Sequence, residues 1–151
     1  EFRRVLFRSA VYETIAGEKD MFPVEEAPDS TKVYDLIAVG FWLQAGKPDP
    51  KTQDYLPKIG KGKKLFLFAT HGAAAGSDHE ENAIAYAKQL APNADIVGKF
   101  SCQGEVNPKV LEKVKSKPQP PVWLADAPKA IGHPDDADIE ALKKIIKSLG
   151  E

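Results

Sequence analysis

Three short runs of consecutive apolar residues alternate along the chain with polar or glycine-rich stretches. They lie within residues 32–40, 63–70 and 95–100. Continuous apolarity over so few residues is typical of strands that are buried on both faces. Residues 19–24 form a weaker strand candidate, which we place at an edge because Pro23 has no N–H to donate to a neighbouring strand.

Between these strands apolar residues recur every three or four positions, which predicts amphipathic helices. Candidate N-terminal caps are Ser77 and Asp78 before one helix and Asn107, which a proline follows, before another. The expected helices cover residues 10–16, 49–59, 78–90, 108 onward and 135–149. Strands and helices in alternation predict an α/β fold, in which right-handed crossovers join parallel strands and helices cover both faces of the sheet.

Ligands of such folds bind beyond the carboxyl ends of the strands. The first loop at that end is expected to begin Gly40, Phe41 and Trp42. An indole beside an open crevice offers a flat face on which a planar ring can stack. The alternative is that the aromatic side chains simply close the core, where large aromatic residues are usually well buried.

The second loop consists mostly of small residues and begins Thr70, His71, Gly72 and Ala73. Small side chains let the backbone approach a ligand closely, although the loop has neither the P-loop nor the dinucleotide-binding pattern. The alternative is a flexible connection. His71 is either a proton donor or a solvated loop residue. The spacing between His71 and His79 does not suggest a pair of metal ligands, and we assign no metal.

The third loop reads Ser101, Cys102, Gln103 and Gly104, and its polar atoms suit the edge of a heterocycle. Cys102 can act as a nucleophile only if His71 lies beside it. A small buried thiol is the commoner role of a single cysteine, so we assign no catalytic residue. Together, one aromatic, one small and one polar loop at the same rim suit a planar amphipathic ring better than a sugar or a peptide.

Composition narrows the class of protein. With 151 residues, 42% of them hydrophobic and 28% charged, the chain has the length and balance of one soluble globular domain. One cysteine excludes an internal disulfide, and the apolar runs are too short to cross a bilayer. A formal charge of −1 disfavours a nucleic-acid partner. We therefore expect neither a nucleic-acid nor a membrane partner.

The first nine residues, EFRRVLFRS, differ in composition from the rest of the chain. They hold all three arginines, whereas the remaining residues contain only lysine as a basic residue apart from histidine. The string also resembles the translated end of a sequencing adapter. We therefore predict that residues 1–9 are a non-native segment and that residues 10–151 form a single domain without its start; a native basic N-terminus is the alternative. Because Val11 and Ile15 continue a four-residue spacing back to Phe7, this segment is predicted to extend the first helix.

Three fragments resemble the flavodoxin-like superfamily, specifically its small single-domain members. They are YDLIAVGFW, KKLFLFATHGA and GKFSCQGEV, at residues 34–42, 63–73 and 98–106. The resemblance implies a three-layer fold with parallel strands in the order 2-1-3-4-5. It also implies one non-covalently bound FMN and a role in electron transfer. The cofactor-binding residues that it implies are Gly40, Phe41, Trp42, Thr70, His71, Gly72, Ala73, Ser101, Cys102, Gln103 and Gly104.

The sequence departs from that family at its start. The first strand, and the loop after it that wraps the FMN phosphate at a helix N-terminus, have no counterpart in it. We therefore expect this chain, as the later part of a parent protein, to bind FMN weakly. Two alternatives stay open: an FMN-dependent NAD(P)H quinone or azo-dye reductase, and a flavin-free interaction module of the same fold.

Carboxylates near two of the loops bear on possible partners. They belong to Asp49, Asp54, Asp78, Glu80 and Glu81. Carboxylates around an exposed ring would steer redox partner proteins, an electron-donating reductase and an acceptor, that dock through a basic surface. The alternative is an ordinary solvated helix face. The single thiol and the family resemblance lead us to expect a cytoplasmic location.

Overall fold

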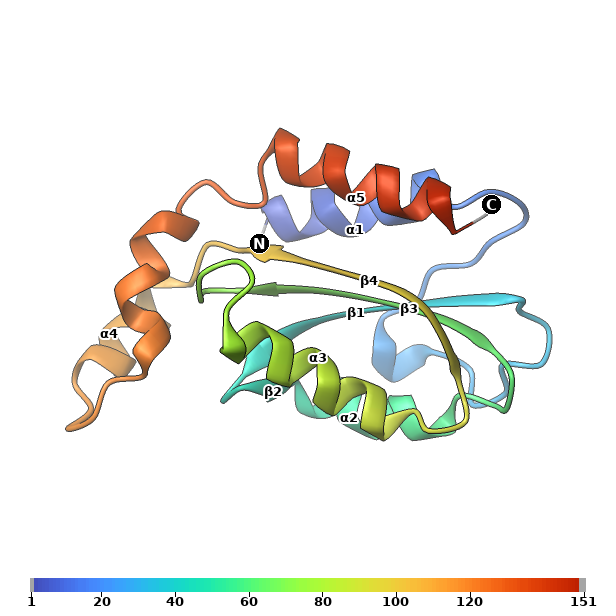
Figure 1. The fold of residues 1–151 in the computed structure, drawn as a ribbon, viewed down its shortest axis with the longest axis horizontal. Helices are drawn as coiled ribbons and strands as arrows, with labels where there is room; N and C mark the ends of the chain where they lie inside the picture. Colours follow the sequence, from blue (N-terminus) through green and yellow to red (C-terminus); the bar gives the residue numbers. More distant parts are fainter. Residues whose placement is uncertain (1, 150–151) are drawn as a thin grey trace.

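The computed structural model describes residues 2–149, and the side chains from residue 7 onward. Its centre is a four-stranded sheet in the order β2-β1-β3-β4 (Figure 1). The strands are β1 (Leu36–Gln44), β2 (Lys47–Pro48), β3 (Lys64–His71) and β4 (Asp95–Gln103). β1, β3 and β4 run parallel, whereas the short β2 pairs antiparallel with the end of β1. The predicted α/β fold with a parallel sheet is confirmed.

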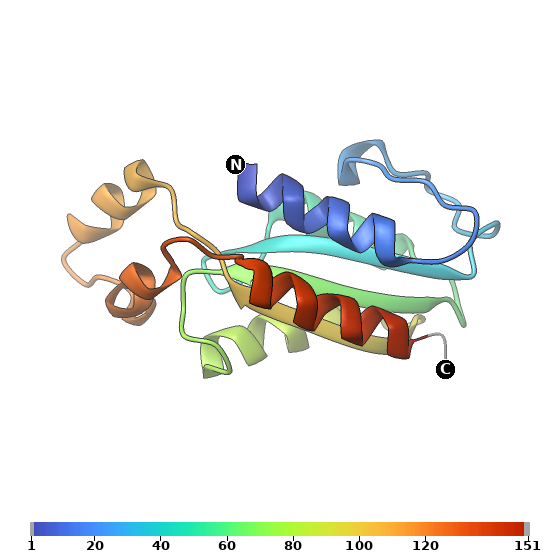
Figure 2. The same cartoon turned by 90° about the horizontal axis from the view of Figure 1, so that it is seen from above.

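Helices cover both faces of this sheet, as Figures 1 and 2 show. The helices are α1 (Phe2–Thr14), α2 (Pro50–Tyr55), α3 (Asp78–Leu90), α4 (Pro108–Lys115) and α5 (Asp136–Ser148), with 3-10 segments η1 (Val24–Glu26), η2 (Leu56–Lys58) and η3 (Val122–Ala130). α1 and α5 lie side by side on one face, and α2 and α3 lie on the other. α4 and η3 form an arm that projects beyond the carboxyl end of the sheet.

The central strand β3 is buried from Leu65 to its end, which confirms the apolar run predicted as a two-sided strand. Leu65, Leu67 and Ala69 belong to the core on the α2/α3 face. Phe66 and Phe68 belong to the core on the α1/α5 face. The alternation of side chains along a strand therefore builds two separate cores with one strand between them.

Strand β1 is less enclosed than β3. It pairs with β3 from Leu36 to Trp42, but with β2 only at Leu43 and Gln44. Most of its residues are only partly buried. Within residues 2–149 no further strand covers its outer edge, so three of the five parallel strands implied by the family resemblance are present in the described chain.

The prediction of an edge strand at residues 19–24 is wrong. Val24 begins η1 after the cap Pro23, and no strand includes the preceding residues. Met21 and Phe22 are 59% and 45% exposed, so these two apolar side chains do not pack against the sheet. Exposure removes the burial that would stabilise a strand here.

The predicted ends of the strands also need correction. β1 continues past Gly40 to Gln44, because the chain turns back through Ala45 and Gly46 to form a hairpin with β2. Both turn residues have positive φ angles, +52° and +76°, which suit a tight two-residue hairpin turn. β4 likewise continues to Gln103.

Helix α1 begins at Phe2 and includes the first apolar residues of the chain, as predicted for residues 1–9. Phe7 is 2% exposed and contacts the ring of Phe68 edge-on, with ring centres 5.8 Å apart. α1 thus completes the core of its face. The non-native origin of residues 1–9 stays a prediction, and Glu1 lies outside the described residues.

The predicted helix caps are confirmed at both positions. The side chain of Ser77 accepts a hydrogen bond from the backbone N–H of Glu80, and that of Asn107 accepts one from Lys109. Each satisfies a backbone donor that the first helical turn leaves free. Among the described helices, none is long and apolar enough to cross a membrane.

Candidate functional site

The three predicted segments meet at one edge of the sheet. The register of the parallel strands pairs Trp42 with Thr70 and Thr70 with Cys102. These three residues therefore form a row across β1, β3 and β4 at their carboxyl ends. The sequence-based prediction that the segments share a rim agrees with this register.

The predicted site residues lie mostly in strands and not in the loops after them. Gly40, Phe41 and Trp42 lie inside β1, Thr70 and His71 end β3, and Ser101 to Gln103 end β4. Successive side chains of a strand point to opposite faces of the sheet. The longer strands therefore divide the predicted site between the α1/α5 face and the α2/α3 face.

Neighbouring aromatic residues of β1 show this division most clearly. Phe41 is 5% exposed and belongs to the core on the α2/α3 face. Trp42 points to the other face and is 44% exposed. Phe41 therefore follows the interpretation that the aromatic residues are buried in the core. Of these two residues, only Trp42 has a ring exposed to solvent, as the stacking interpretation requires.

The glycines of the predicted site make room for protein atoms. A Cβ on Gly40 would lie 2.3 Å from the ring of Phe68, and one on Gly72 would lie 2.7 Å from Val106 and 3.2 Å from Trp123. A Cβ on Gly104 would lie 3.0 Å from Thr70. The space beside Gly72, which the small residues of the loop suggested for a ligand, is thus filled by Val106 and by Trp123 of the arm.

Cys102 is buried on the α1/α5 face. Burial raises the pKa of its thiol far above the usual range, and nearby Asp138, Glu80 and Asp135 add to that shift. His71 follows Thr70, the partner of Cys102 in the register, and therefore points to the opposite face. The alternative of a Cys102–His71 nucleophile pair is wrong for this geometric reason.

His71 is fully buried on the α3 side, so the expectation of a solvated loop histidine is wrong. Its Nδ1 lies 3.0 Å from the carbonyl oxygen of Ala73, and its Nε2 lies 3.0 Å from Oε2 of Glu80. Burial lowers the pKa of His71, and the facing carboxylate of Glu80 opposes that shift. The imidazole thus connects the end of β3 to the loop after it and to the first turn of α3.

Glu80 extends this polar cluster to the neighbouring strand. Its carboxylate accepts hydrogen bonds from the backbone N–H of Gly76, at 2.7 Å, and from the hydroxyl of Ser101. The side-chain amide of Gln103 donates to the Ala73 carbonyl oxygen at 3.0 Å. His71, Ser101 and Gln103, predicted as ring-binding residues, are therefore held by bonds within the protein.

Glu80 was not among the predicted site residues, and the pattern Ser77-x-x-Glu80 is the signal that could have found it. A serine cap followed three residues later by glutamate is typical of a helix start, with the glutamate turned back toward the cap. Here the glutamate reaches back to Gly76, one residue before the cap. Once turned back, it also reaches His71.

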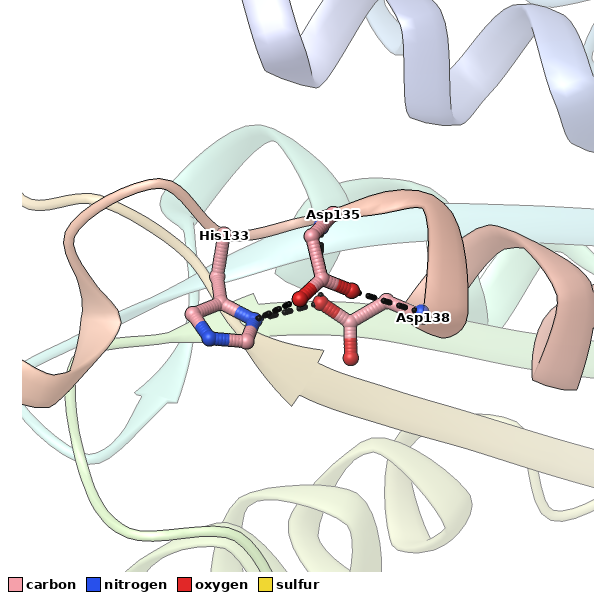
Figure 3. A group of neighbouring side chains, drawn as sticks. All are labelled: His133, Asp135 and Asp138. Carbon is pink, nitrogen blue, oxygen red and sulfur yellow. Dashed lines mark hydrogen bonds and ion pairs between the residues drawn. The ribbon is translucent and has the colours of Figure 1, made fainter.

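A second cluster of titratable side chains lies at the start of α5 (Figure 3). One ring nitrogen of His133 and one carboxylate oxygen each of Asp135 and Asp138 lie within 4.8 Å of one another. His133 Nδ1 lies 2.6 Å from Oδ2 of Asp138 and 3.7 Å from Oδ2 of Asp135. Each aspartate also accepts a hydrogen bond from the other's backbone N–H. This reciprocal capping of α5 accounts for the position of both carboxylates.

Part of the predicted carboxylate patch is unavailable to a partner. Asp49 is 1% exposed and accepts hydrogen bonds from the backbone N–H and hydroxyl of Thr52. Glu80 is occupied by the cluster around His71. Asp54, Asp78 and Glu81 are exposed.

A shallow hollow lies at the opposite end of the sheet. It has a volume of about 670 Å³ and is lined by residues that include Tyr12, Gly17, Lys19, Val33 and Tyr34. The last two immediately precede β1, so this hollow is at the amino end of the strands. The sequence patterns did not predict it, because it forms between the end of α1 and a distant turn.

The chain is similar in sequence to known proteins. The profile of the flavodoxin domain family matches residues 6–147. A flavodoxin-like domain-containing protein BilS from Clostridioides difficile (strain CD3) is 27% identical over 92% of this chain and 85% of its own. A protein of the same name from Clostridium symbiosum (strain WAL-14163) is 26% identical over 87% and 76%.

One solved structure also resembles part of the chain. It is a crystal structure of a flavoprotein in complex with FMN from Lactobacillus acidophilus NCFM. The similarity has a TM-score of 0.35 and 22% sequence identity, and it covers 46% of this chain and 44% of that one.

Proposed function

Because the chain belongs to the flavodoxin domain family, we propose that it binds FMN at the carboxyl ends of β1, β3 and β4 and carries electrons. The observation that supports this proposal best is Trp42. Its indole is 44% exposed at that rim, although the residue before it is buried in the core. An exposed indole provides a flat apolar face for a planar ring.

The neighbours of Trp42 in the same row are buried. Thr70 and Cys102 are 7% and 4% exposed, so other protein atoms cover them. The proposed stacking contact is therefore assigned to the indole alone. When bound, FMN would supply the one-electron or two-electron chemistry, and the chain would contribute stacking, exclusion of water and polar atoms near the ring.

We limit the proposed contact to the ring end of the cofactor and assign no residue of the chain to the FMN phosphate. Contacts to the ring alone do not include the hydrogen bonds that a helix N-terminus donates to a phosphate. Weak binding of FMN by this chain is therefore part of the proposal.

Titration of the purified chain with FMN, followed by flavin fluorescence, tests the proposal. We expect fluorescence to fall on binding, because a stacked indole quenches the flavin, and we expect Trp42→Ala to abolish the quenching. Phe22→Ala is the matched control, since Phe22 is 45% exposed and lies outside the rim. Equal quenching by Trp42→Ala and the native chain would contradict the proposed site.

The same preparation separates an electron carrier from an enzyme. We expect the FMN-loaded protein to accept electrons from a reductase and to pass them to an acceptor protein. Rapid oxidation of NADPH by the FMN-loaded protein and a quinone, with no second protein present, would instead favour the alternative that the protein is a reductase. No spectral change with FMN at any concentration would favour the flavin-free interaction module.

Docking of a basic redox partner is a further part of the proposal. The exposed carboxylates of Asp78 and Glu81 lie in the first turn of α3, close to the loop that ends β3. Opposite charges on a partner would speed its association at low salt. Electron-transfer rates that do not change with ionic strength would contradict this mode of docking.

A further inference from the structure

The imidazole of His71 lies between two hydrogen-bond acceptors. The carbonyl oxygen of Ala73 can only accept, so Nδ1 must carry a proton and donate to it. A neutral imidazole has one N–H, which leaves Nε2 with a lone pair. That lone pair faces Oε2 of Glu80 at 3.0 Å, and Nε2 has no satisfied hydrogen bond.

The surroundings of His71 give it no other partner for Nε2 among the described residues. Its side chain is 0% exposed. From α3 the titratable groups that face it are Glu80 and, at longer range, His79. From β4 the facing residues Ser101 and Gln103 are uncharged. A single proton on Nε2 therefore decides whether the contact with Glu80 is a charge-assisted hydrogen bond or a repulsion between two acceptors.

We propose that the His71–Glu80 contact is a proton-dependent latch on the loop of residues 72–76. With the proton, Nε2–H donates to the Glu80 carboxylate and the latch is closed. Without it, the two facing lone pairs repel and the carboxylate moves away from the imidazole. Because the same carboxylate accepts from the N–H of Gly76, the loop responds to the protonation of a residue at its other end.

The latch is expected to close in mildly acidic solution. Burial lowers the pKa of His71 below the ordinary value of about 6.5, so the imidazole gains its second proton below that pH. Gly76 has a φ of +71°, which favours glycine, and nothing lies within 4 Å of the position of its absent Cβ.

One consequence rests on the proposed function. The loop of residues 72–76 follows Thr70, which lies beside Trp42 in the candidate flavin site. A loop that is already ordered loses less conformational entropy on binding. FMN is therefore expected to bind more tightly when the latch is closed.

Proton NMR of the chain without cofactor tests the latch directly. The sequence contains three histidines, so the imidazole signals are few and can be assigned with the variants below. We expect the Gly76 amide signal and the His71 ring signal to shift with a common midpoint below about pH 6.5. A Gly76 amide that does not change while His71 titrates would overturn the proposal.

Glu80→Gln is the sharpest variant. The contact with Nε2 and the hydrogen bond from the Gly76 N–H both use Oε2, so one amide group at this position cannot keep both of them. The variant also removes the negative charge that favours the doubly protonated imidazole, so the midpoint of His71 should fall. If the Gly76 amide still titrates, it should do so at that lowered midpoint. His79→Gln is the control, because His79 lies in the same helix turn but makes no contact with Nε2; the Gly76 midpoint should persist. A Gly76 midpoint that stays at its native value in Glu80→Gln would sink the latch.

FMN titrations at about pH 5.5 and 7.5 test the consequence separately. For each protein we compare the affinity for FMN at the lower pH with that at the higher pH. We expect this ratio to be about fivefold larger for the native chain than for Glu80→Gln. Fivefold is at the low end of the coupling observed between two sites of a protein. The comparison with Glu80→Gln cancels the titration of the FMN phosphate itself. No binding by either protein would refute the proposed function and leave the NMR result standing. Equal pH dependence in both would refute the coupling of the latch to FMN.

Discussion

The two sides of the sheet's carboxyl end are built from alternate residues of the same strands, yet they differ in character. On the α3 side, His71, Glu80 and Ser101 are joined by hydrogen bonds and largely buried. On the α1/α5 side, the indole of Trp42 is exposed, and the polar cluster of His133, Asp135 and Asp138 lies at the start of α5. One side therefore buries its polar network against α3, and the other leaves a large aromatic ring exposed. A residue's place in the alternation decides which of these roles it has.

The largest difference in stability should appear between alanine substitutions at the two neighbouring aromatic residues of β1. Phe41→Ala removes a buried ring from the α2/α3 core and is expected to cost about 3–5 kcal/mol of unfolding free energy. Trp42→Ala, one residue along, should cost less than about 1 kcal/mol because its ring is half exposed. Urea unfolding of both variants checks this. Similar losses would mean that the two sides do not differ as described.

Glu80→Ala should have the next largest effect. It removes the acceptor of the exposed Gly76 N–H and of the partly buried Ser101 hydroxyl, and a lost hydrogen bond of this kind costs about 0.5–1.5 kcal/mol. Glu81→Ala changes an exposed carboxylate of the same helix turn and should alter stability by no more than about 0.5 kcal/mol. Thermal unfolding of the two variants measures the difference, and equal values would show that the polar cluster adds no stability.

A smaller effect should appear in the dependence of stability on pH. Because the pKa of His71 is lowered by burial, the unfolded chain binds this proton more readily than the folded chain. The stability from His71 is present above about pH 6.5 and is lost as the pH falls through the folded-state pKa. The slope cannot exceed about 1.4 kcal/mol per pH unit for one proton.

His71→Gln should flatten this part of the pH profile, as judged from urea unfolding at several values between about pH 5 and 7.5. His79→Gln is the matched control and should keep the slope. A native profile that is flat below pH 6.5, or a variant profile as steep as the native one, would contradict a lowered pKa at this position.

The smallest effect concerns Cys102 on the α1/α5 side. Its thiol is 4% exposed and its pKa is raised by burial, so the reactive thiolate is scarce in the folded chain. We expect a thiol-specific reagent to label it at a rate limited by unfolding, and to label it rapidly in urea. Fast labelling of the folded chain at neutral pH would show that Cys102 is not covered as described.

Several features of the fold were predictable because they depend on residues close together in the chain. The apolar run of residues 63–70 identified β3, and the caps Ser77 and Asn107 marked the starts of two helices. The common rim also followed, since parallel strands place their carboxyl ends at one edge. These inferences need only local composition and the direction of the chain.

The details of the candidate site were less predictable. The prediction ended β1 at Gly40 and placed Trp42 in a loop, because an apolar run does not show where a hairpin will extend a strand. Nor did the sequence indicate that Trp123, far along the chain, fills the space beside Gly72. His71 looked like a solvated residue because its partner is nine positions away, across a loop.

The amino-acid sequence by itself determined an α/β chain of the flavodoxin domain family with its aromatic, small and polar segments at one rim, because strand type, helix caps and strand direction are encoded in short stretches. Only the tertiary structure decided which of those residues are available to a ligand. That decision depends on the side to which each residue points and on which distant group fills the adjacent space. It left Trp42 exposed, and it buried His71 against Glu80.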